Sequence, residues 1–153
     1  MIKLGIVSDT HGLLRPEVLD RLAGSDRILH AGDVGAVEIL EQLRELAPVD
    51  AVRGNVDLGD GLASLPTVVA GTAEEVSYRM IHQREHVPAE WQKEARLILF
   101  GHSHRPEMEW HGNTLWLNPG AAGRRRFHLP LTVAIVTVDG RRIVPEILSV
   151  EAS

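Results

Sequence analysis

The first third of the chain alternates short apolar runs with polar segments. Ile2 to Val7 is almost continuously apolar, and a polar segment follows it directly. Such a run is typical of a strand covered on both faces, so we expect a polar loop at the end of a buried strand. Residues 27–30 and 49–52 repeat the pattern and predict two further strands, each followed by a polar segment that contains glycine.

Helical spacing fills the segments between these strands. Pro16 suits the first turn of a helix that runs to Leu22, and Gly24 stands where a left-handed C-terminal cap belongs. A second helix is predicted by apolar residues at helical spacing that a proline ends: Val37, Leu40, Leu43, Leu46 and Pro48. The order strand, loop, helix therefore occurs twice, and a glycine-rich surface loop is expected up to Ser64.

The rest of the chain changes to short strands. We expect strands at 67–70, 76–81, 97–100, 108–110, 114–117 and 132–138, with a helix only at 88–95 and a hairpin turn at 111–113. Strands alternating with helices, followed by hairpins, favour an α/β sandwich of mixed sheets with helices outside. No linker or repeat divides the sequence, so we expect a single domain over residues 1–153.

Length and composition exclude several classes of protein. A chain of 153 residues suits one domain that buries about 70% of its unfolded surface. With 44% hydrophobic and 24% charged residues, the chain is neither disordered, nor collagen-like, nor a coiled coil. No apolar run approaches the roughly 18 residues of a membrane span, and the first residues read as a strand instead of a signal peptide. We therefore expect a soluble, cytoplasmic protein that does not enter a membrane.

Charge and cysteine usage narrow the chemistry further. The sequence has no cysteine, which excludes disulfides, a thiolate nucleophile and cysteine-bound metals, so any metal must have nitrogen and oxygen ligands. A net charge of -5 disfavours stable binding to nucleic acid, because counterion release needs clustered cations. Arg124 to Arg126 is the one basic run.

Residues with metal-binding chemistry follow the expected strands. They are Asp9, His11, Asp33, Asn55, His82, His102 and His104. Ligand sites of open α/β sheets assemble at the carboxyl ends of strands, where these residues stand. Asp9 and His11 are two residues apart, as are His102 and His104, so extended backbone would place both side chains of a pair on the same side. Each pair could hold one metal ion or two neighbouring ions.

Each of these residues also has an ordinary structural explanation. Asn55 after a glycine is typical of a turn, and His82 on a strand is typical of a core histidine with its hydrogen bonds satisfied. Asp33 could cap the next helix, and His30 could either orient a ligand or be satisfied by the backbone. Several nitrogen and oxygen donors, all at strand ends, are nevertheless hard to explain as independent accidents. The joint pattern favours one shared site.

The ordered motifs resemble those of calcineurin-like metallophosphoesterases, specifically their small single-domain branch from bacteria and archaea. In chain order the motifs are Ser8-Asp9-Thr10-His11-Gly12, Gly32-Asp33, Gly54-Asn55-Val56-Asp57, His82, Gly101-His102-Ser103-His104 and Asn118-Pro119-Gly120. The resemblance extends from Ile2 to about Val138. It implies a four-layer α/β/β/α sandwich of two mixed sheets flanked by helices, with a two-metal site.

The resemblance also implies roles for the residues. One divalent ion would be held by Asp9, His11 and His104, the other by Asn55, His82 and His102, and Asp33 would bridge the two. Asp33, Asn55 and His104 are then expected to take part in catalysis, and Asn55 to contact the substrate. Arg124 follows the last motif and could also meet a substrate phosphate, although a solvated charge run explains it as well.

The activity implied is hydrolysis of a small phosphate ester, more often a diester than a monoester, by in-line attack of a metal-bridging hydroxide. Manganese is the expected metal, and nickel, iron, cobalt or zinc suit the same ligands, because affinity order alone does not select among them. A homo-oligomer is possible. The alternative is a scaffold or binding module that keeps the fold with little or no catalysis, as in the retromer subunit that resembles this family.

The chain departs from the family pattern at two places. Val56 stands where many larger relatives have a histidine thought to protonate the leaving group, so another group, such as Asp57 or a metal-bound water, would have to do so. His82-Gln83-Arg84 stands where the family often has His-Gly-His. We therefore expect His82 to be the weakest ligand, more so if Arg84 points inward.

Overall fold

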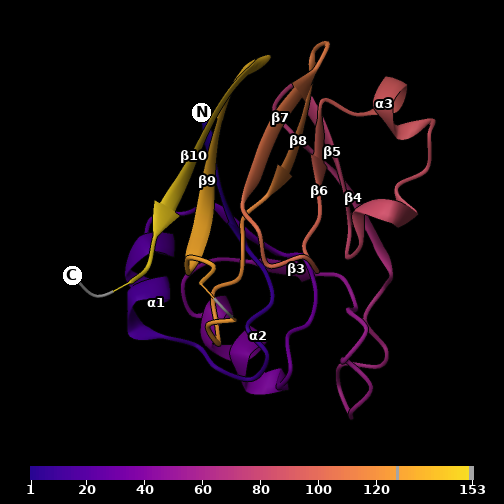
Figure 1. Cartoon of the computed structure of the whole chain (residues 1–153). Coiled ribbons are helices and arrows are strands. Elements are labelled where there is room, and N and C mark those ends of the chain that lie inside the picture. Colours follow the sequence, from indigo (N-terminus) through magenta and orange to yellow (C-terminus); the bar gives the residue numbers. More distant parts are fainter. Residues whose placement is uncertain (127, 152–153) are drawn as a thin grey trace.

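Two mixed β-sheets face each other in the computed structural model, which describes residues 1–126 and 128–151 (Figure 1). The first sheet has the order β10-β9-β1-β2-β3. Its strands are β1 (Ile2–Val7), β2 (Arg27–His30), β3 (Val49–Ala51), β9 (Thr132–Asp139) and β10 (Arg142–Ser149). Strands β1, β2 and β3 are parallel, whereas β9 and β10 extend the sheet in antiparallel fashion.

The second sheet repeats this plan with a parallel centre. Its order is β4-β5-β6-β8-β7, in which β5, β6 and β8 are parallel and the two edge strands are antiparallel to their neighbours. The strands are β4 (Val68–Ala73), β5 (Val76–Ile81), β6 (Leu97–Leu99), β7 (Glu107–His111) and β8 (Thr114–Asn118). The expected hairpin joins β7 to β8.

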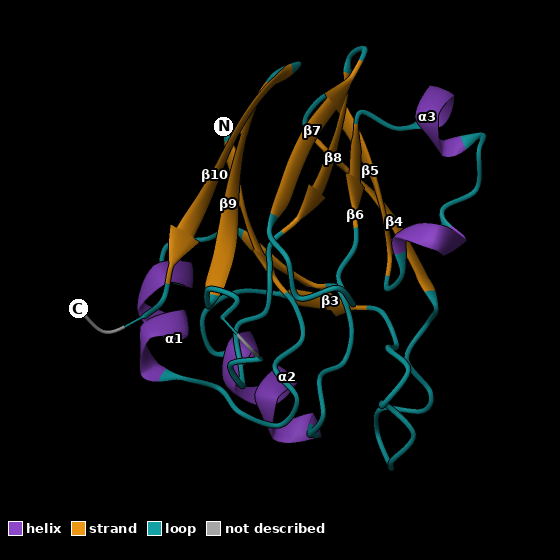
Figure 2. Ribbon diagram, in the orientation of Figure 1, coloured by secondary structure: helices purple, strands orange, loops and turns teal. Residues whose placement is uncertain are grey.

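Side chains alternate between two apolar layers of the first sheet. Along β9, Ala134 and Val136 face the core between the sheets, whereas Val133 and Ile135 face the helices α1 (Pro16–Leu22) and α2 (Val37–Arg44). On the outer face of the second sheet, the short helices η1 (Arg84–His86) and α3 (Trp91–Glu94) lie to one side (Figure 2). The predicted α/β sandwich of two mixed sheets flanked by helices is confirmed.

Strand β10 was not predicted from the sequence. It pairs with β9 from Arg142 to Ser149, yet Pro145 and the charged residues Arg142 and Glu146 weaken its apolar pattern. A proline without an N–H is tolerated at the edge of a sheet, where β10 lies. The apolar pattern therefore did not predict this strand, because a strand at the edge of a sheet can contain proline and charged residues.

Several predicted boundaries were also wrong. The strand expected at 67–70 continues as β4 to Ala73, because Gly71 leaves room for the Tyr78 ring, whose Cζ would lie 2.4 Å from a Cβ there. The helix expected at 88–95 is only α3, and α2 ends at Arg44, before Leu46, which is 37% exposed.

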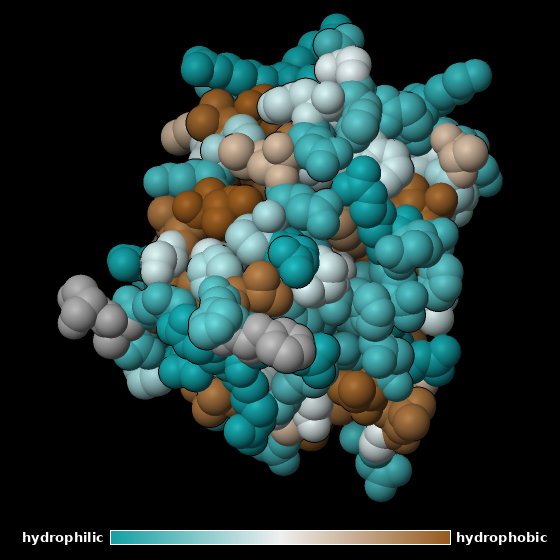
Figure 3. Space-filling view, in the orientation of Figure 1, coloured by the Kyte–Doolittle hydropathy of each residue, from teal (hydrophilic) through white to brown (hydrophobic). Residues whose placement is uncertain are grey.

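The loops that leave β1, β2, β3, β5 and β6 approach one another at one end of the sandwich (Figure 1). Backbone hydrogen bonds join them, including Asp9 N–H to the Gly32 carbonyl at 3.0 Å and Gly101 N–H to the His82 carbonyl at 2.9 Å. Apolar side chains form separate patches among polar ones on the face shown in Figure 3. Among the described residues, no helix is long and apolar enough to cross a membrane.

Candidate metal centre

Left-handed backbone distinguishes the loops that carry the expected ligands. Positive φ angles occur at Asp9 (54°), His11 (47°), Asp33 (56°), His102 (71°) and His104 (66°). For residues other than glycine, the left-handed region costs about 1 kcal/mol each, and such strain is concentrated at functional sites. The expected extended backbone was therefore wrong. In its place, tight turns aim the side chains inward, and His102 and His104 point to different groups of donors.

The first group consists of Asp9, His11 and His104, whose donor atoms lie within 4.8 Å of one another. Asp9 Oδ2 accepts hydrogen bonds from Ser8 Oγ at 2.7 Å and from the His102 N–H at 3.0 Å. Asp9 Oδ1 is buried without a hydrogen-bond partner among the described residues, 3.7 Å from His11 Nε2 and 3.5 Å from His104 Nε2. An orphaned carboxylate oxygen facing two imidazole nitrogens fits a bound cation.

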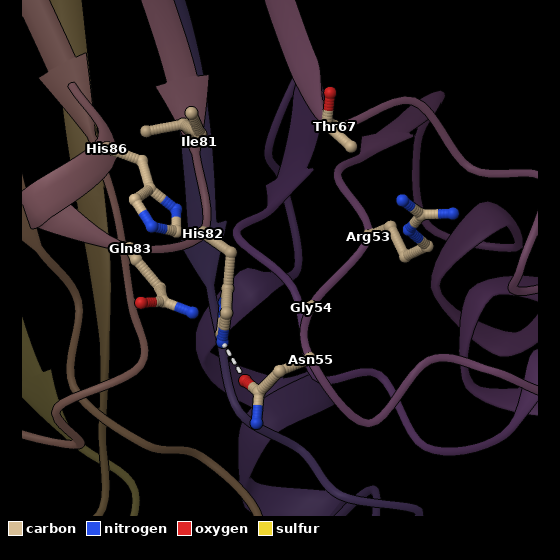
Figure 4. A pocket seen from close by; sticks show the side chains of 8 residues that line it. All are labelled: Arg53, Gly54, Asn55, Thr67, Ile81, His82, Gln83 and His86. Carbon is tan, nitrogen blue, oxygen red and sulfur yellow. Dashed lines mark hydrogen bonds between the residues drawn. The ribbon is translucent and has the colours of Figure 1, made fainter. Parts of the chain in front are cut away.

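The second group consists of Asp33, His82 and His102, with Asn55 among them. His82 Nδ1 donates to the Ala31 carbonyl at 2.7 Å, so its Nε2 presents a lone pair. Nε2 lies 3.0 Å from Asn55 Oδ1, a contact drawn as a dashed line in Figure 4, and 3.2 Å from Asp33 Oδ2. Asn55 Oδ1 thus faces only acceptors, and a cation would satisfy all of these atoms.

Asp33 lies between the two groups. Its Oδ1 accepts from the Val56 N–H at 3.0 Å, whereas its Oδ2 lies 3.2 Å from His82 Nε2 and 3.5 Å from His11 Nε2. Burial opposes ionisation, but the His82 ring, which can donate to this carboxylate when it is protonated, and the Val56 N–H together hold the pKa of the Asp33 carboxyl at about 2. The structure therefore brings one ionised carboxylate oxygen to both groups of ligands.

The imidazoles of the site differ in their proton affinity. The neighbouring Asp9 carboxylate raises the pKa of His11. Burial opposes the charged form of His82, yet the Asp33 carboxylate raises its pKa overall, whereas burial lowers the pKa of His104. Protons and metal ions would compete most strongly at His11 and His82, because both seek the same lone pairs.

Two glycines allow the ligands to approach closely. A Cβ at Gly54 would lie 2.1 Å from Asp33 Oδ1, and a Cβ at Gly32, where φ is +104°, would lie 2.5 Å from His82 Nδ1. Neither contact is possible for a larger residue. A glycine directly before Asp33, and another before Asn55, is the sequence signal of this packing.

Asp57 supports the site in a way that the sequence did not reveal. Its carboxylate is fully buried and accepts hydrogen bonds from the backbone N–H groups of Gly54 at 2.8 Å, Gly35 at 3.0 Å and Val34 at 3.2 Å. These bonds join the loop that carries Asn55 to the loop that carries Asp33. A carboxylate committed to three donors does not serve as a proton donor for a leaving group.

His30 is a core histidine satisfied by its neighbours. Its Nδ1 accepts from the Gly32 N–H at 3.1 Å, so its Nε2 donates to Thr10 Oγ1 at 3.0 Å, and that hydroxyl donates to the Val34 carbonyl. Burial lowers the pKa of His30 to about 4. The neutral ring therefore links the loops that follow β1 and β2.

Arg84 points away from the centre. Its guanidinium donates to Glu107 at 2.8 Å and lies over the rings of Trp116 (5.0 Å) and Phe100 (5.3 Å) on the outer face of the second sheet. The possibility that Arg84 weakens the second group from inside the site is therefore wrong. Val56 is 44% exposed and offers no proton.

Cavities lie on both sides of the centre. His11, His104 and Arg124 to Arg126 line one of about 250 Å³, so Arg124 lies beside the first group of ligands. The other, of about 190 Å³, is lined by residues that include Asn55, His82, Gln83 and His86 (Figure 4).

The sequence profile of the calcineurin-like phosphoesterase superfamily domain matches residues 2–141. The chain belongs to this superfamily. A probable metallophosphoesterase of Methanothermobacter thermautotrophicus is 31% identical over 158 residues, covering 95% of this chain and 91% of that protein.

Solved structures of other proteins share the fold. An archaeal phosphodiesterase superposes with a TM-score of 0.79 at 20% identity, covering 96% of this chain and all of that one. Vps29 of Entamoeba histolytica, in complex with Zn²⁺, has a TM-score of 0.77 at 20% identity, covering 98% of this chain and all of that one. At such identities the likeness shows the fold. Divalent metals are implied by the family, and the two groups of donors in this chain fit them.

Proposed function

We propose that this calcineurin-like phosphoesterase is a binuclear metal enzyme that hydrolyses phosphodiesters. The observation that carries the proposal is the position of Asp33 Oδ2, within 3.5 Å of an imidazole from each group of ligands. The first ion would be held by Asp9, His11 and His104, the second by Asn55, His82 and His102. Asp33 would serve both.

The chain supplies little negative charge to this centre. Asp9 and Asp33 are the carboxylates of the two groups, and the other ligands are neutral. Two divalent ions therefore leave the centre positive, which attracts a phosphate ester to a protein whose net charge is -5. When bound, the ions would activate water for in-line attack and stabilise charge on the phosphoryl oxygens.

The ligands themselves prepare the site for this chemistry. Hydrogen bonds fix the Asp9 and Asp33 carboxylates and the His82 ring before any ion binds. Such positioning removes much of the reorganisation that catalysis would otherwise require. We expect Asn55 and His104, one from each group, to contact the reacting phosphate as well.

The two cavities support a diester over a monoester. A phosphodiester has two organic arms that leave the phosphorus in different directions, and one cavity adjoins each group of ligands. A monoester would fill only one of them. Arg124 lines the cavity beside His11 and His104, where it can contact the substrate.

Imidazole, carboxylate and amide donors suit manganese, our expected metal, as well as nickel, iron, cobalt and zinc. The alternative of a scaffold with little catalysis does not explain why strained backbone is retained at five residues that meet in one place. A homo-oligomer stays a prediction.

The test is an assay with defined metals. Protein stripped with a chelator is restored with manganese, nickel, iron, cobalt or zinc, and hydrolysis of bis(4-nitrophenyl) phosphate is compared with that of 4-nitrophenyl phosphate. We expect diester hydrolysis that depends on added metal, with the diester preferred. Undiminished turnover after confirmed metal removal would refute the mechanism, and absence of turnover with every metal would favour the scaffold.

A further inference from the structure

The two cavities beside the centre differ in charge. Three guanidinium groups, those of Arg124, Arg125 and Arg126, line the cavity next to His11 and His104. The opposite cavity has one, that of Arg53, which extends away from His82 and donates to the Ala63 carbonyl at 3.0 Å (Figure 4). The centre therefore has a strongly cationic side and a mostly neutral one.

The loop that carries the arginines, residues 123–126, is fixed against the metal centre. The Arg15 guanidinium donates to the Gly123 carbonyl at 2.8 Å, and the Ala122 N–H donates to the Ser8 carbonyl at 3.1 Å. A Cβ at Gly123 would lie 1.9 Å from the Thr10 carbonyl oxygen, so the loop packs directly on the turn between Asp9 and His11. The position of the cations relative to the first group of ligands is thereby set.

The three arginines differ in their partners. Arg125 pairs with Glu151 at 2.5 Å, and the same Glu151 oxygen accepts from the Leu131 N–H at 3.2 Å. Among the residues that the structure describes, Arg124 and Arg126 have no ion-pair partner. Arg124 and Arg126 line the same cavity as His11 and His104. Two uncompensated cations therefore face a cavity beside the first group of ligands.

We propose that the cavity lined by Arg124 and Arg126 is a subsite for a second phosphate group, carried on one arm of the diester substrate. The inference rests on the proposed function, because it assumes that the scissile phosphate lies at the metal centre. Arginine suits this role, since its planar guanidinium gives two parallel hydrogen bonds to a phosphate. The neutral cavity then accepts the arm without a further charge. The substrate class is an unsymmetrical phosphodiester with a terminal phosphate on one side.

Matched dinucleotides test the subsite by kinetics. Thymidylyl thymidine is compared with the same molecule carrying a 5′-phosphate or a 3′-phosphate, and chromatography of the products counts cleavage of the diester bond alone. We expect one phosphorylated form to have a kcat/KM about tenfold or more above that of the unphosphorylated form. The preference should shrink as salt is raised, because the three arginines are exposed.

Three variants separate the subsite from the centre. Arg126→Ala and Arg124→Ala should each reduce the ratio of the two kcat/KM values towards one, whereas Arg53→Ala, in the opposite cavity, should keep the ratio. Equal kcat/KM values for all three dinucleotides in the wild type would overturn the subsite while leaving the proposed function intact. An unchanged ratio in both arginine variants would overturn it too.

Binding to the metal-free protein gives a readout independent of turnover. Thymidine 3′,5′-bisphosphate is titrated into chelator-stripped protein, and amide chemical shifts are followed by NMR. We expect shifts in the loop 123–126 that are lost in Arg126→Ala. Shifts confined to the other cavity, or none at saturating concentration, would contradict the subsite. If no diester is cleaved with any metal, the proposed function fails, and this titration decides the subsite alone.

Discussion

His82 Nε2 lies 3.2 Å from Asp33 Oδ2, and the opposite nitrogen of the same ring donates to the Ala31 carbonyl. The ring is therefore held from both sides. The sequence around His82 departs from the family pattern, but the neighbouring Arg84 turns outward onto Trp116. The departure changes the outer surface of the second sheet and leaves the His82 ring beside Asp33.

Asp33→Asn should reduce metal-dependent turnover by about 10²-fold or more, because it removes a charge that serves both groups of ligands. The variant should also bind fewer ions at the same free metal concentration. Turnover and metal content are measured on the same preparations. Asp50→Asn, the same change at an exposed position of β3, is the control and should retain both properties. Normal activity in Asp33→Asn would contradict the bridging position.

The two ions should bind with unequal affinity. The first group has Asp9 as its own carboxylate, whereas the second has neutral Asn55 and two imidazoles besides its share of Asp33. Less negative charge attracts a divalent ion less strongly. Calorimetry should therefore resolve two binding steps, with activity following the weaker one. His82→Ala should remove the weaker step and His104→Ala the stronger, so two equal steps would refute the asymmetry.

Hydrolysis should depend steeply on the leaving group. Val56 has no proton to give, and Asp57 is buried and accepts three backbone N–H groups, so neither assists departure. General acid help is typically worth about 10²–10⁴-fold. Aryl esters should thus be cleaved far faster than alkyl esters. The rate is plotted against leaving-group pKa, and a flat line with chemistry rate-limiting would mean that another group donates the proton.

The metal-free protein should lose stability in acid because of His30, which is protonated more readily in the unfolded chain than in the folded protein. The pKa of His30 is about 4 in the folded protein and 6.5 in the unfolded chain. The contribution of His30 to the free energy of unfolding is therefore complete above pH 6.5 and is lost as the pH falls towards 4. The shift corresponds to about 3 kcal/mol of unfolding free energy. Urea unfolding of His30→Gln at several pH values should show a shallower decline than the wild type. His128→Gln, at an exposed position, should follow the wild type.

The sequence predicted which residues meet but not how the backbone brings them together. The continuous apolar run of β1 marks a buried strand, so the position of Asp9 at its end could be read directly. Left-handed turns carry no comparable pattern. The family resemblance implied that His102 and His104 serve different groups of ligands, but the backbone that directs them apart emerged only from the structure. The same holds for Asp57, whose three partners come from two different loops, and for Arg84, whose direction depends on aromatic rings in β8 and after β6.

The left-handed backbone of the loops that carry the expected ligands lowers the stability of the fold while it positions the metal-binding side chains. Asp9 and Asp33 are held at φ values that glycine adopts without strain and that asparagine tolerates better than most residues. Such replacements are expected to raise the thermal stability of the metal-free protein, because they relieve strain and unpaired buried charge together. Aspartate at these positions is therefore expected to favour metal binding and to disfavour folding of the metal-free chain. Consensus-based stabilisation of this fold should leave both positions untouched.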